Sequence, residues 1–329
     1  MRKGLPKFWL QGGPLAGLLA PLGWLMASVA LARRQLYRRG LLPSRRLPVP
    51  VIIVGNIFVG GTGKTPLVAW LCVRLQAMGR RPGIVLRGYG GRAAQWPQRV
   101  LADSDPDLVG DEAVLLARET GVPVAAGPAR AEAAALLLEA GCDVIIGDDG
   151  LQHYALARDA EIAVIDAGRG LGNGRCLPAG PLREPRGRLG TVDLVIANGG
   201  PGSFTPYFFK LVAEPLQALG PTAEPPPVQD AVHAVAGIGN PQRFFQQLRQ
   251  QGFEPIEHPF PDHHRYRPEE LSFADELPIV MTAKDAVKVS GFSNARCWVL
   301  PVRAEPDAAT QNALDALLAR VLEGYNGAS

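Results

Sequence analysis

The sequence predicts an α/β fold of the P-loop NTPase type, with a mostly parallel sheet flanked by helices. Short runs rich in β-branched residues alternate with helical stretches along the chain. One run, residues 51–54, leads into a glycine-rich loop ending in Gly-Lys-Thr, and Pro66 then opens a helix. Another apolar run ends in Asp148 and Asp149. We further expect a second, smaller α/β domain and an N-terminal membrane helix.

Composition indicates a globular protein with about two domains. The chain has 329 residues, of which 47% are apolar and 20% charged, as in a folded protein with a large core. Its four cysteines lie far apart and form no C-x-x-C pair. They are therefore predicted to be reduced core residues, which fits a cytoplasmic compartment.

The basic charge is concentrated at one end of the chain. Residues 1–46 hold nine lysines and arginines and no acid, which leaves 25 basic against 31 acidic residues elsewhere. A body with this acidic balance repels a nucleic-acid backbone. A basic segment at one end suits an anionic membrane surface instead.

The N-terminal segment is predicted to associate with a membrane. Residues 8–32 carry no charge and are long enough to cross a bilayer, and bases flank them on both sides. Pro14 and Pro21 weaken a straight span, so a helix lying in the interface is equally compatible. Ala30-Leu31-Ala32 also resembles a signal-peptidase site. A nucleotide loop downstream argues against export, because ATP is cytosolic.

The loop after residues 51–54 is predicted to bind the phosphates of a nucleotide. Its glycines let backbone N–H groups turn toward phosphate, the lysine adds a point charge, and the final threonine can hold Mg²⁺. The usual pattern places a glycine where this chain has Phe58, so the loop is a variant. The expected phosphate-binding residues are Gly60, Gly61, Thr62, Gly63, Lys64 and Thr65.

The acidic pair after the apolar run is predicted to hold Mg²⁺. Asp148 and Asp149 stand where a Walker B strand delivers its acid, opposite Thr65 of the phosphate loop. A turn-forming Asp-Asp-Gly is the competing interpretation. The sequence leaves open which of the two carboxylates binds the metal directly.

Two loops carry further candidates. Tyr89 lies in a glycine-rich loop after the predicted strand 83–86, where it can cover a base or sugar or be an ordinary loop aromatic. Residues 168–190 form a loop too long to be structureless without a function. Within it, Arg183 can neutralise phosphate and Glu184 can assist the metal, unless this is simply an arginine-rich surface loop.

The sequence alone does not decide the roles of two further acid-containing motifs. Asp111 follows Gly110 at a helix start, and helix capping explains it as well as catalysis does. Asp262, His263 and His264 concentrate titratable groups between prolines, and histidine suits proton transfer near neutral pH. No other ligand falls at a zinc-site spacing, so a structural zinc is not expected.

A shift to proline, alanine and glutamate around residues 215–227 predicts an interdomain linker. The second unit has predicted strands at 231–236, 278–282 and 299–302. Its predicted helices cover 244–251, the stretch starting at 283, and 308–322. The predicted organisation is a membrane-associated segment 1–33, a nucleotide domain 34–214, a linker 215–228 and a C-terminal domain 229–329.

The order of these motifs resembles that of the tetraacyldisaccharide 4′-kinases of lipid A biosynthesis. The resemblance rests on Gly-Asn-Ile-Phe-Val-Gly-Gly-Thr-Gly-Lys-Thr-Pro, Arg-Gly-Tyr-Gly, Val-Gly-Asp111-Glu112, Asp148-Asp149-Gly-Leu-Gln-His153, Pro-Ala-Gly-Pro-Leu-Arg183-Glu184, Asp262-His263-His264 and Thr282-Ala-Lys284-Asp285. Together with the apolar N-terminus, these motifs span most of the chain.

The resemblance implies phosphoryl transfer from ATP, with Mg²⁺, to the 4′-hydroxyl of a lipid-linked glucosamine disaccharide 1-phosphate. It places the protein at the cytoplasmic face of the inner membrane. Lys64 and Thr65 would hold phosphate and metal, and Asp111 would be the general base, assisted by His263 or His264; we place this role on His263. Residues implied to complete the site are Arg130, His153, Arg183 and Glu184, with Asp148 and Asp149 near the metal.

The main alternative is a membrane-associated P-loop ATPase switch. Such proteins also use a glycine-glycine variant loop, but they place a lysine immediately before the glycine pair, and this chain has Val59 there. A cytosolic P-loop biosynthetic enzyme is a third possibility, which leaves residues 8–32 unexplained. The sequence favours the kinase.

Overall fold

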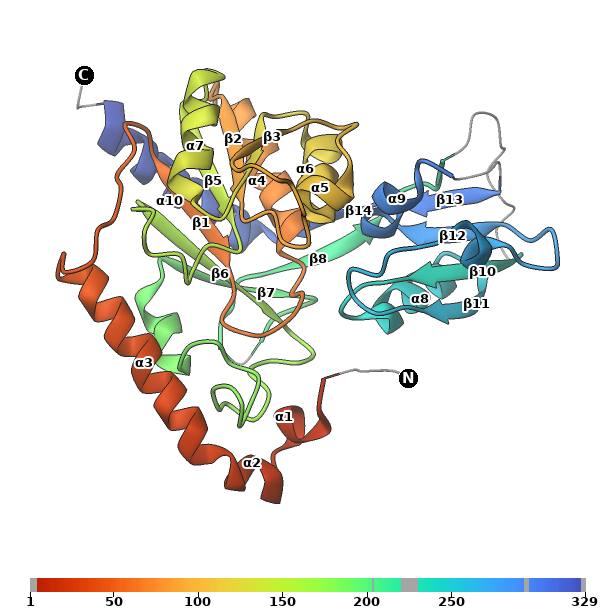
Figure 1. Cartoon of the computed structure of the whole chain (residues 1–329), viewed down its shortest axis with the longest axis horizontal. Helices are drawn as coiled ribbons and strands as arrows, with labels where there is room; N and C mark the ends of the chain where they lie inside the picture. The colour runs from red at the N-terminus through yellow and green to blue at the C-terminus, as the bar shows by residue number, and fades with distance from the viewer. Residues whose placement is uncertain (1–4, 203, 220–229, 293–295, 327–329) are drawn as a thin grey trace.

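The computed structural model of the chain describes residues 5–202, 204–219, 230–292 and 296–326. Within these residues the strands form one nine-stranded and one five-stranded sheet, which lie side by side in Figure 1. The large sheet contains β1 (Val51–Gly55), β2 (Pro82–Leu86), β3 (Gln98–Val100), β4 (Val124–Ala126), β5 (Val144–Asp148), β6 (Ala160–Asp166), β7 (Leu194–Asn198), β8 (Phe208–Ala213) and β14 (Val302–Pro306).

Helices cover both faces of the large sheet. They are α4 (Lys64–Ala77), α5 (Pro106–Val109), α6 (Asp111–Thr120), α7 (Arg130–Glu139) and α10 (Ala308–Asn326), with the 3₁₀ helix η1 (Arg186–Thr191). Ile52 and Val54 of β1 pack into the core cluster formed with α4, α6 and α10. Val51 and Ile53 pack into the cluster on the α7 side. This alternation follows from the two-residue period of a strand that is buried on both faces.

The strand order brings the two strongest sequence motifs together. The order is β14-β8-β7-β6-β1-β5-β2-β4-β3, and β1 pairs in parallel with both β5 and β6. In this register Val54 lies opposite Asp148. Because parallel strands end at the same edge of a sheet, the phosphate loop after β1 and the acids at the end of β5 are neighbours.

The small sheet has the order β11-β10-β12-β13-β9. Its strands are β9 (Gln217–Ala218), β10 (Ala231–Ala236), β11 (Glu254–Pro259), β12 (Ile279–Thr282) and β13 (Cys297–Leu300), and its helices are α8 (Pro241–Gln250), α9 (Ala283–Val289) and the 3₁₀ helix η2 (Pro268–Leu271). The Thr282 hydroxyl accepts a hydrogen bond from the Asp285 N–H and so caps α9. The expected smaller α/β unit is present.

The pairing of the strands differs from the predicted domain boundaries at two places. Strand β9 lies inside the predicted linker and pairs with β13. Residues 220–228 of that linker lie outside the described residues. The predicted strand 299–302 is two strands separated by Pro301, and β14 pairs with β8 of the large sheet. The chain therefore returns to the large sheet, where α10 packs, before it ends.

The structure does not support an N-terminal helix that crosses a membrane. The apolar N-terminal segment folds as α1 (Lys7–Gln11), α2 (Pro14–Leu18) and α3 (Ala20–Arg38). In the described part of the chain, no helix combines the length and apolar character that a membrane crossing requires. Gly12 and Gly13 have φ angles of 79° and 116°, and Pro14 follows them, so the backbone leaves the helical region at this point. The apolar run is thereby divided into short pieces.

One side of this N-terminal segment is attached to the loop that follows β6. Arg175 of the loop donates to the Ala16 carbonyl at 2.8 Å, and the Trp9 indole donates to the Pro178 carbonyl at 2.9 Å. A Cβ on Gly23 would lie 2.9 Å from the Cys176 carbonyl oxygen, so only glycine permits this close approach. The three helices are therefore held against the body of the protein.

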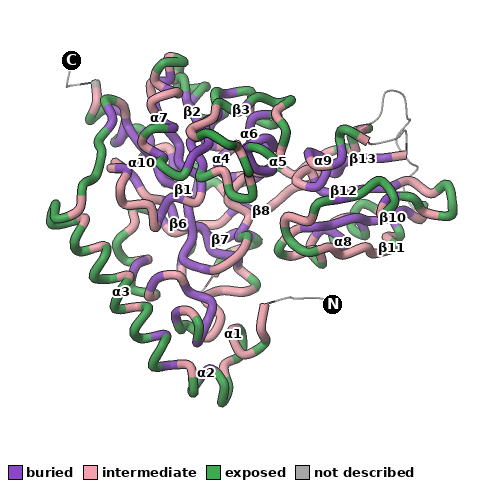
Figure 2. The backbone as a smooth tube through the Cα atoms, in the orientation of Figure 1, coloured by how far each residue is buried: buried purple, intermediate pink, exposed green. Residues whose placement is uncertain are grey.

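The other side of α2 and α3 exposes large apolar side chains. Leu18, Leu22, Leu25 and Val29 recur at helical spacing and are all exposed, Leu18 to 77%. Figure 2 shows the length of α3 mostly green, with few buried positions. A stripe of this size on a folded protein indicates an interaction surface.

Candidate active site

The phosphate loop has the backbone form that its glycines permit. Gly60 and Gly63 have φ angles of 93° and 76°, which side chains rarely tolerate. A Cβ on Gly63 would lie 2.1 Å from the Asn198 side-chain nitrogen, which donates to the Thr62 carbonyl at 2.9 Å. This hydrogen bond ties the loop to the end of β7.

Phe58 explains why the loop lacks its first glycine. Its side chain is buried in the core on the α7 side, and its backbone forms a bridge to Leu182. The Arg169 guanidinium lies 5.3 Å from the centre of the phenyl ring. Since the φ angle of Phe58 is not positive, this position does not need glycine.

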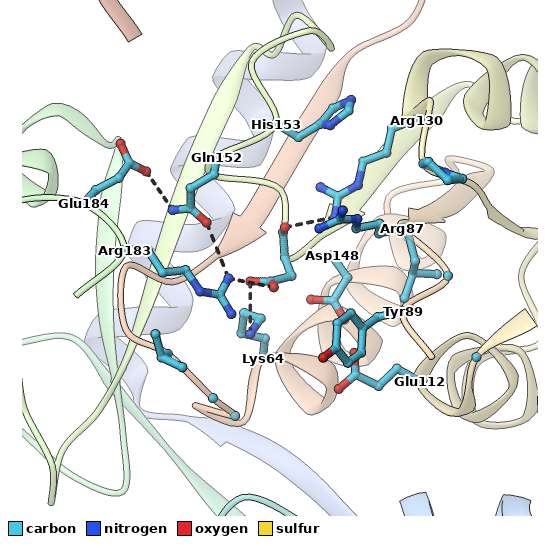
Figure 3. A pocket seen from close by; sticks show the side chains of 18 of the residues that line it. Lys64, Arg87, Tyr89, Glu112, Arg130, Asp148, Gln152, His153, Arg183 and Glu184 are labelled. Atoms are coloured by element: carbon cyan, nitrogen blue, oxygen red, sulfur yellow. Dashed lines mark hydrogen bonds and ion pairs between the residues drawn. The ribbon is translucent and has the colours of Figure 1, made fainter. Parts of the chain in front are cut away.

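Lys64, the first residue of α4, points to the acidic pair. Its Nζ lies 3.3 Å from Asp149 Oδ1, and Arg183 Nη1 lies 2.9 Å from Asp149 Oδ2. Burial acts to raise the pKa of Asp149, but these two cations outweigh it and hold that pKa below its ordinary value. Figure 3 shows the ends of the Lys64 and Arg183 side chains close together. Both cations are thus placed where phosphate would bind.

Asp148 has the burial and the unpaired oxygen expected of a metal ligand. It ends β5 and is 2% exposed, and no described group donates a hydrogen bond to its Oδ1. Burial raises its pKa to about 7, against the attraction of Lys64. A divalent cation would relieve this isolated buried charge. In the described residues no three carboxylate, histidine or cysteine side chains form a ready-made cluster, so Mg²⁺ would also need Thr65 and phosphate oxygens.

Glu184 is engaged by protein groups. Gln152 Nε2 donates to one of its oxygens at 2.7 Å, and the Tyr154 hydroxyl donates to the other at 2.6 Å. The Arg188 guanidinium lies 3.6 Å away. In this arrangement Glu184 holds the wall of the site in place, while its predicted role near the metal stays a prediction.

Arg130 and His153 lie on the far side of the acidic pair. Arg130 Nη2 donates to the Asp149 carbonyl at 2.9 Å, whereas its buried Nε and Nη1 have no described hydrogen-bond partner. Burial lowers the pKa of Arg130 to about 10. Burial and the surrounding arginines lower the pKa of His153 to about 4, so this histidine is neutral. The two unsatisfied N–H groups suit an anionic ligand.

Asp111 and His263, the two predicted catalytic residues, lie in contact although they belong to the large-sheet and small-sheet units respectively. Asp111 begins α6, and its two carboxylate oxygens lie 3.0 and 2.9 Å from His263 Nδ1. The neighbouring His264 instead pairs with Glu270 at 3.1 Å. The Tyr89 ring lies 5.1 Å from the His263 ring. Of the two histidines left open by the sequence, the structure brings His263 to Asp111.

A cavity of about 860 Å³ is lined by groups of the phosphate loop, the acidic pair and His263. Asp111 contacts His263 but is not among the residues that line this cavity. The cavity lining includes Gly60, Gly61, Lys64, Tyr89, Arg130, Asp148, Asp149, His153, Arg183, Glu184 and His263. Sequence reasoning assigned no catalytic or binding role to several other charged or polar lining residues, among them Arg33, Arg87, Glu112, Gln152 and Tyr154. Glu112 and Gln152 lie inside motifs already singled out, so their positions were a usable signal. No pattern in the sequence pointed to Arg33 of α3, because only the packing of α3 brings this residue to the cavity.

One cavity is lined both by the loop that can hold nucleotide phosphates and by His263, the partner of Asp111. A phosphate site and a proton acceptor in one cavity are the parts of a P-loop kinase site. The family follows from sequence comparison: the chain belongs to the tetraacyldisaccharide-1-P 4′-kinase family, whose model matches residues 15–322. The resemblance seen in the motifs is therefore confirmed.

Individual relatives of this chain are tetraacyldisaccharide 4′-kinases. The tetraacyldisaccharide 4′-kinase of Alkalilimnicola ehrlichii is 59% identical over 96% of this chain and 97% of its own length. The tetraacyldisaccharide 4′-kinase of Halorhodospira halophila is 52% identical over 96% of this chain and 97% of its own length. Among solved structures, LpxK from Aquifex aeolicus in complex with ATP superimposes with a TM-score of 0.78 at 29% identity, covering 94% of this chain and 100% of the other.

Proposed function

We propose that this kinase transfers the γ-phosphoryl group of ATP to the 4′-hydroxyl of a tetraacylated glucosamine disaccharide 1-phosphate, the reaction of lipid A biosynthesis for which its family is named. The observation that supports it most directly is that His263, which contacts Asp111, lines the same cavity as Lys64. An ATPase switch needs no base for a hydroxyl acceptor. A kinase does, because an alcohol is a weak nucleophile until its proton is accepted.

The donor half of the proposed site is built on the phosphate loop. Backbone N–H groups of residues 60–65 would hold the phosphates of ATP, with Lys64 and Arg183 adding positive charge. Thr65 and Asp148 would hold Mg²⁺, with Asp149 and Glu184 close by. When bound, the metal neutralises charge on the phosphate oxygens. Tyr89 would cover the nucleotide or sugar from its exposed loop.

The acceptor half depends on Asp111. Burial acts to raise the pKa of Asp111, but the hydrogen bond from His263 and the charge of Lys284 lower it below its ordinary value, so Asp111 is ionised at neutral pH. As Asp111 takes the hydroxyl proton, the acceptor oxygen bonds to the γ-phosphorus. The bond from that phosphorus to the β–γ bridging oxygen breaks, and ADP leaves. Lys64, Arg130 and Arg183 balance the charge.

We further propose that α1, α2 and α3 lie in the cytoplasmic face of the inner membrane. Supporting this placement, the exposed stripe Leu18, Leu22, Leu25 and Val29 would enter the bilayer surface, and the basic residues of the segment suit anionic headgroups. Val29 also lines the active-site cavity. The acceptor, with its acyl chains in the bilayer, would thus reach the site without leaving the membrane.

A direct assay tests the proposed reaction. The purified full chain is incubated with ATP, Mg²⁺ and an acylated glucosamine disaccharide 1-phosphate, and the lipid product is analysed by mass spectrometry and phosphorus NMR. A new phosphate ester on the 4′-oxygen is expected. ATP hydrolysis without a phosphorylated lipid would instead support the ATPase alternative.

A further inference from the structure

Side chains hold three consecutive backbone carbonyls of the phosphate loop. The carbonyls of residues 60–62 each accept one such hydrogen bond. The donors, in chain order, are Asn56 Nδ2 at 3.1 Å, the Arg169 guanidinium, and Asn198 Nδ2 at 2.9 Å. In a trans peptide unit the C=O and the N–H of the next residue point in opposite directions. Each donor therefore turns the next N–H away from itself.

The N–H groups of this stretch are left for a ligand. In the described part of the chain, no backbone oxygen accepts a hydrogen bond from the N–H groups of residues 61–63. Consecutive N–H groups without a protein acceptor form the kind of concave site that binds phosphate. How well they bind depends on how firmly the peptide units are oriented before the ligand arrives, because reorienting them would cost binding free energy.

Asn198 connects this loop to the small-sheet unit. Asn198 ends β7 and is 1% exposed. Its Nδ2 donates to the Thr62 carbonyl, and its Oδ1 accepts from Arg243 Nη2 of α8 at 2.8 Å. A carbonyl can only accept and a guanidinium can only donate, so the two neighbours fix which end of the amide faces which. The orientation of the Asn198 amide therefore depends on Arg243.

The small-sheet unit also approaches the loop directly. A Cβ on Gly239, in the turn before α8, would lie 3.4 Å from the Gly61 nitrogen. Gly61 and Lys64 of the loop line the cavity, whereas Arg243 and Asn198 are not among the residues that line it. Arg243 is thus placed to act on a bound phosphate through the loop rather than by contact.

We propose that Arg243 is a positioning residue for the phosphate loop. By holding Asn198 it fixes the Thr62–Gly63 peptide unit, and with it the N–H groups that would bind the phosphates of ATP. The proposal rests on the proposed ATP site and deepens it, because phosphate binding then depends on a residue of the small-sheet unit that acts from outside the cavity. Without Arg243, the Asn198 amide is free to turn away from Thr62, and the loop loses one of its three carbonyl contacts.

The variants interrupt this path at two points. Arg243→Met removes the guanidinium and leaves an unbranched apolar side chain, and Arg243→Lys keeps a cationic donor. Asn198→Ala removes the link itself. The matched control is Gln247→Met, because Gln247 lies one turn further along α8 and donates to the Leu211 carbonyl of β8 at 3.3 Å. This contact joins the same two sheets without a hydrogen bond to the loop.

Binding of ATP with Mg²⁺ to the full chain is measured by calorimetric titration, and the melting temperature of each variant is recorded. Arg243→Met and Asn198→Ala should each weaken ATP binding about three- to tenfold, the loss expected for one hydrogen bond. We expect partial recovery in Arg243→Lys and no change in Gln247→Met. The KM for ATP should rise with the Kd, while the KM for the lipid acceptor stays within about twofold.

A double variant tests whether Arg243 acts through Asn198. Arg243→Met added to Asn198→Ala should weaken ATP binding no further, because the link is already broken. A further loss equal to that of Arg243→Met alone would show that Arg243 acts on the nucleotide by another route, and would overturn the proposal.

Wild-type ATP affinity in a folded Arg243→Met protein would also overturn it. If that variant does not fold, wild-type affinity in Asn198→Ala would have the same meaning. Intact ATP binding by the wild type without lipid phosphorylation would instead refute the proposed reaction and leave the positioning result standing.

Discussion

His263 Nδ1 lies 2.9 Å from Asp111 Oδ2, although 152 residues separate the two along the chain. Asp111 belongs to a helix on the large sheet, and His263 belongs to the loop after β11 of the small sheet. His263 has a φ angle of 58°, a conformation uncommon outside glycine. The contact turns an acid that resembles a helix-capping residue into a candidate base, and five predictions follow from it and from its surroundings.

The first prediction concerns the base. Asp111→Asn should lower kcat by about 10²–10⁴-fold, because the amide cannot accept the hydroxyl proton, while the Kd for ATP stays within about twofold. Steady-state lipid phosphorylation and nucleotide titration measure the two quantities. Asp107→Asn, an exposed change on α5, is the matched control. Equal losses of turnover and ATP binding would return Asp111 to a structural role.

The second prediction concerns the phosphate loop. Lys64→Ala should weaken ATP binding at least about tenfold and reduce turnover as well, since a charge-assisted contact to phosphate contributes about 1.5–3 kcal/mol. Binding is measured by calorimetric titration with ATP and Mg²⁺. Lys210→Ala on β8 removes an exposed lysine and should change neither quantity. Unaltered ATP affinity in Lys64→Ala would contradict the phosphate-binding role.

The third prediction concerns the metal. The pKa of Asp148 is raised to about 7 in the folded chain, above the value of about 4 for an unfolded aspartate. Its ionised form therefore lowers stability increasingly as pH rises from about 4. At pH 8 without metal, Asp148→Asn should melt at a higher temperature than the wild type, yet gain less stability from Mg²⁺ and ATP together. An Mg²⁺ response equal to that of the wild type would argue against metal binding by Asp148.

The fourth prediction is a pH dependence of stability. The pKa of His263 is raised in the folded state, so its pairing with Asp111 stabilises the fold below the unfolded histidine pKa of about 6.5. That contribution is lost as pH rises through the folded pKa. The pKa of Asp111 is lowered in the folded state, so its ionised form contributes stability above about pH 4, and this contribution is lost as pH falls through the folded pKa.

The matching measurement compares wild type with His263→Gln. Their difference in melting temperature should be larger at pH 5.5 than at pH 8.5. His264→Gln serves as the neighbouring control, because His264 does not contact Asp111. A difference that grows toward alkaline pH would contradict the ion pair.

The fifth prediction concerns the membrane. Leu18→Asp and Leu25→Asp should reduce binding to vesicles containing anionic lipid, because each places a charge in the exposed stripe. Activity should fall more on acceptor in vesicles than on acceptor dispersed in detergent. Leu101→Asp is a suitable control, since Leu101 is 64% exposed, close to the 61% of Leu25. Equal losses with both forms of acceptor would speak against docking through this face.

Much of the large sheet could be predicted because its signals are local. The predicted strand 51–54 is β1 (Val51–Gly55), and the helix predicted from Pro66 begins two residues earlier, at Lys64. An apolar β-branched run buried on both faces is recognisable without its neighbours. Strands β8 and β9, and the return of β14 to the large sheet, were not predicted. The edge strands β9 and β14 take their register from their partners, and β8 pairs with β14 from a distant part of the chain.

The sequence by itself determined the class of chemistry and the family. Two signals were local: a glycine loop that ends in Lys64 and Thr65, and an apolar strand that ends in two acids. Each can be interpreted from residue type and local backbone geometry alone. Only the tertiary structure decided that His263 reaches Asp111 while His264 pairs with Glu270, that α3 brings Arg33 to the cavity, and that Arg243 reaches Asn198. Each of these contacts joins segments far apart in the chain, so it depends on how the two sheets and the N-terminal helices pack.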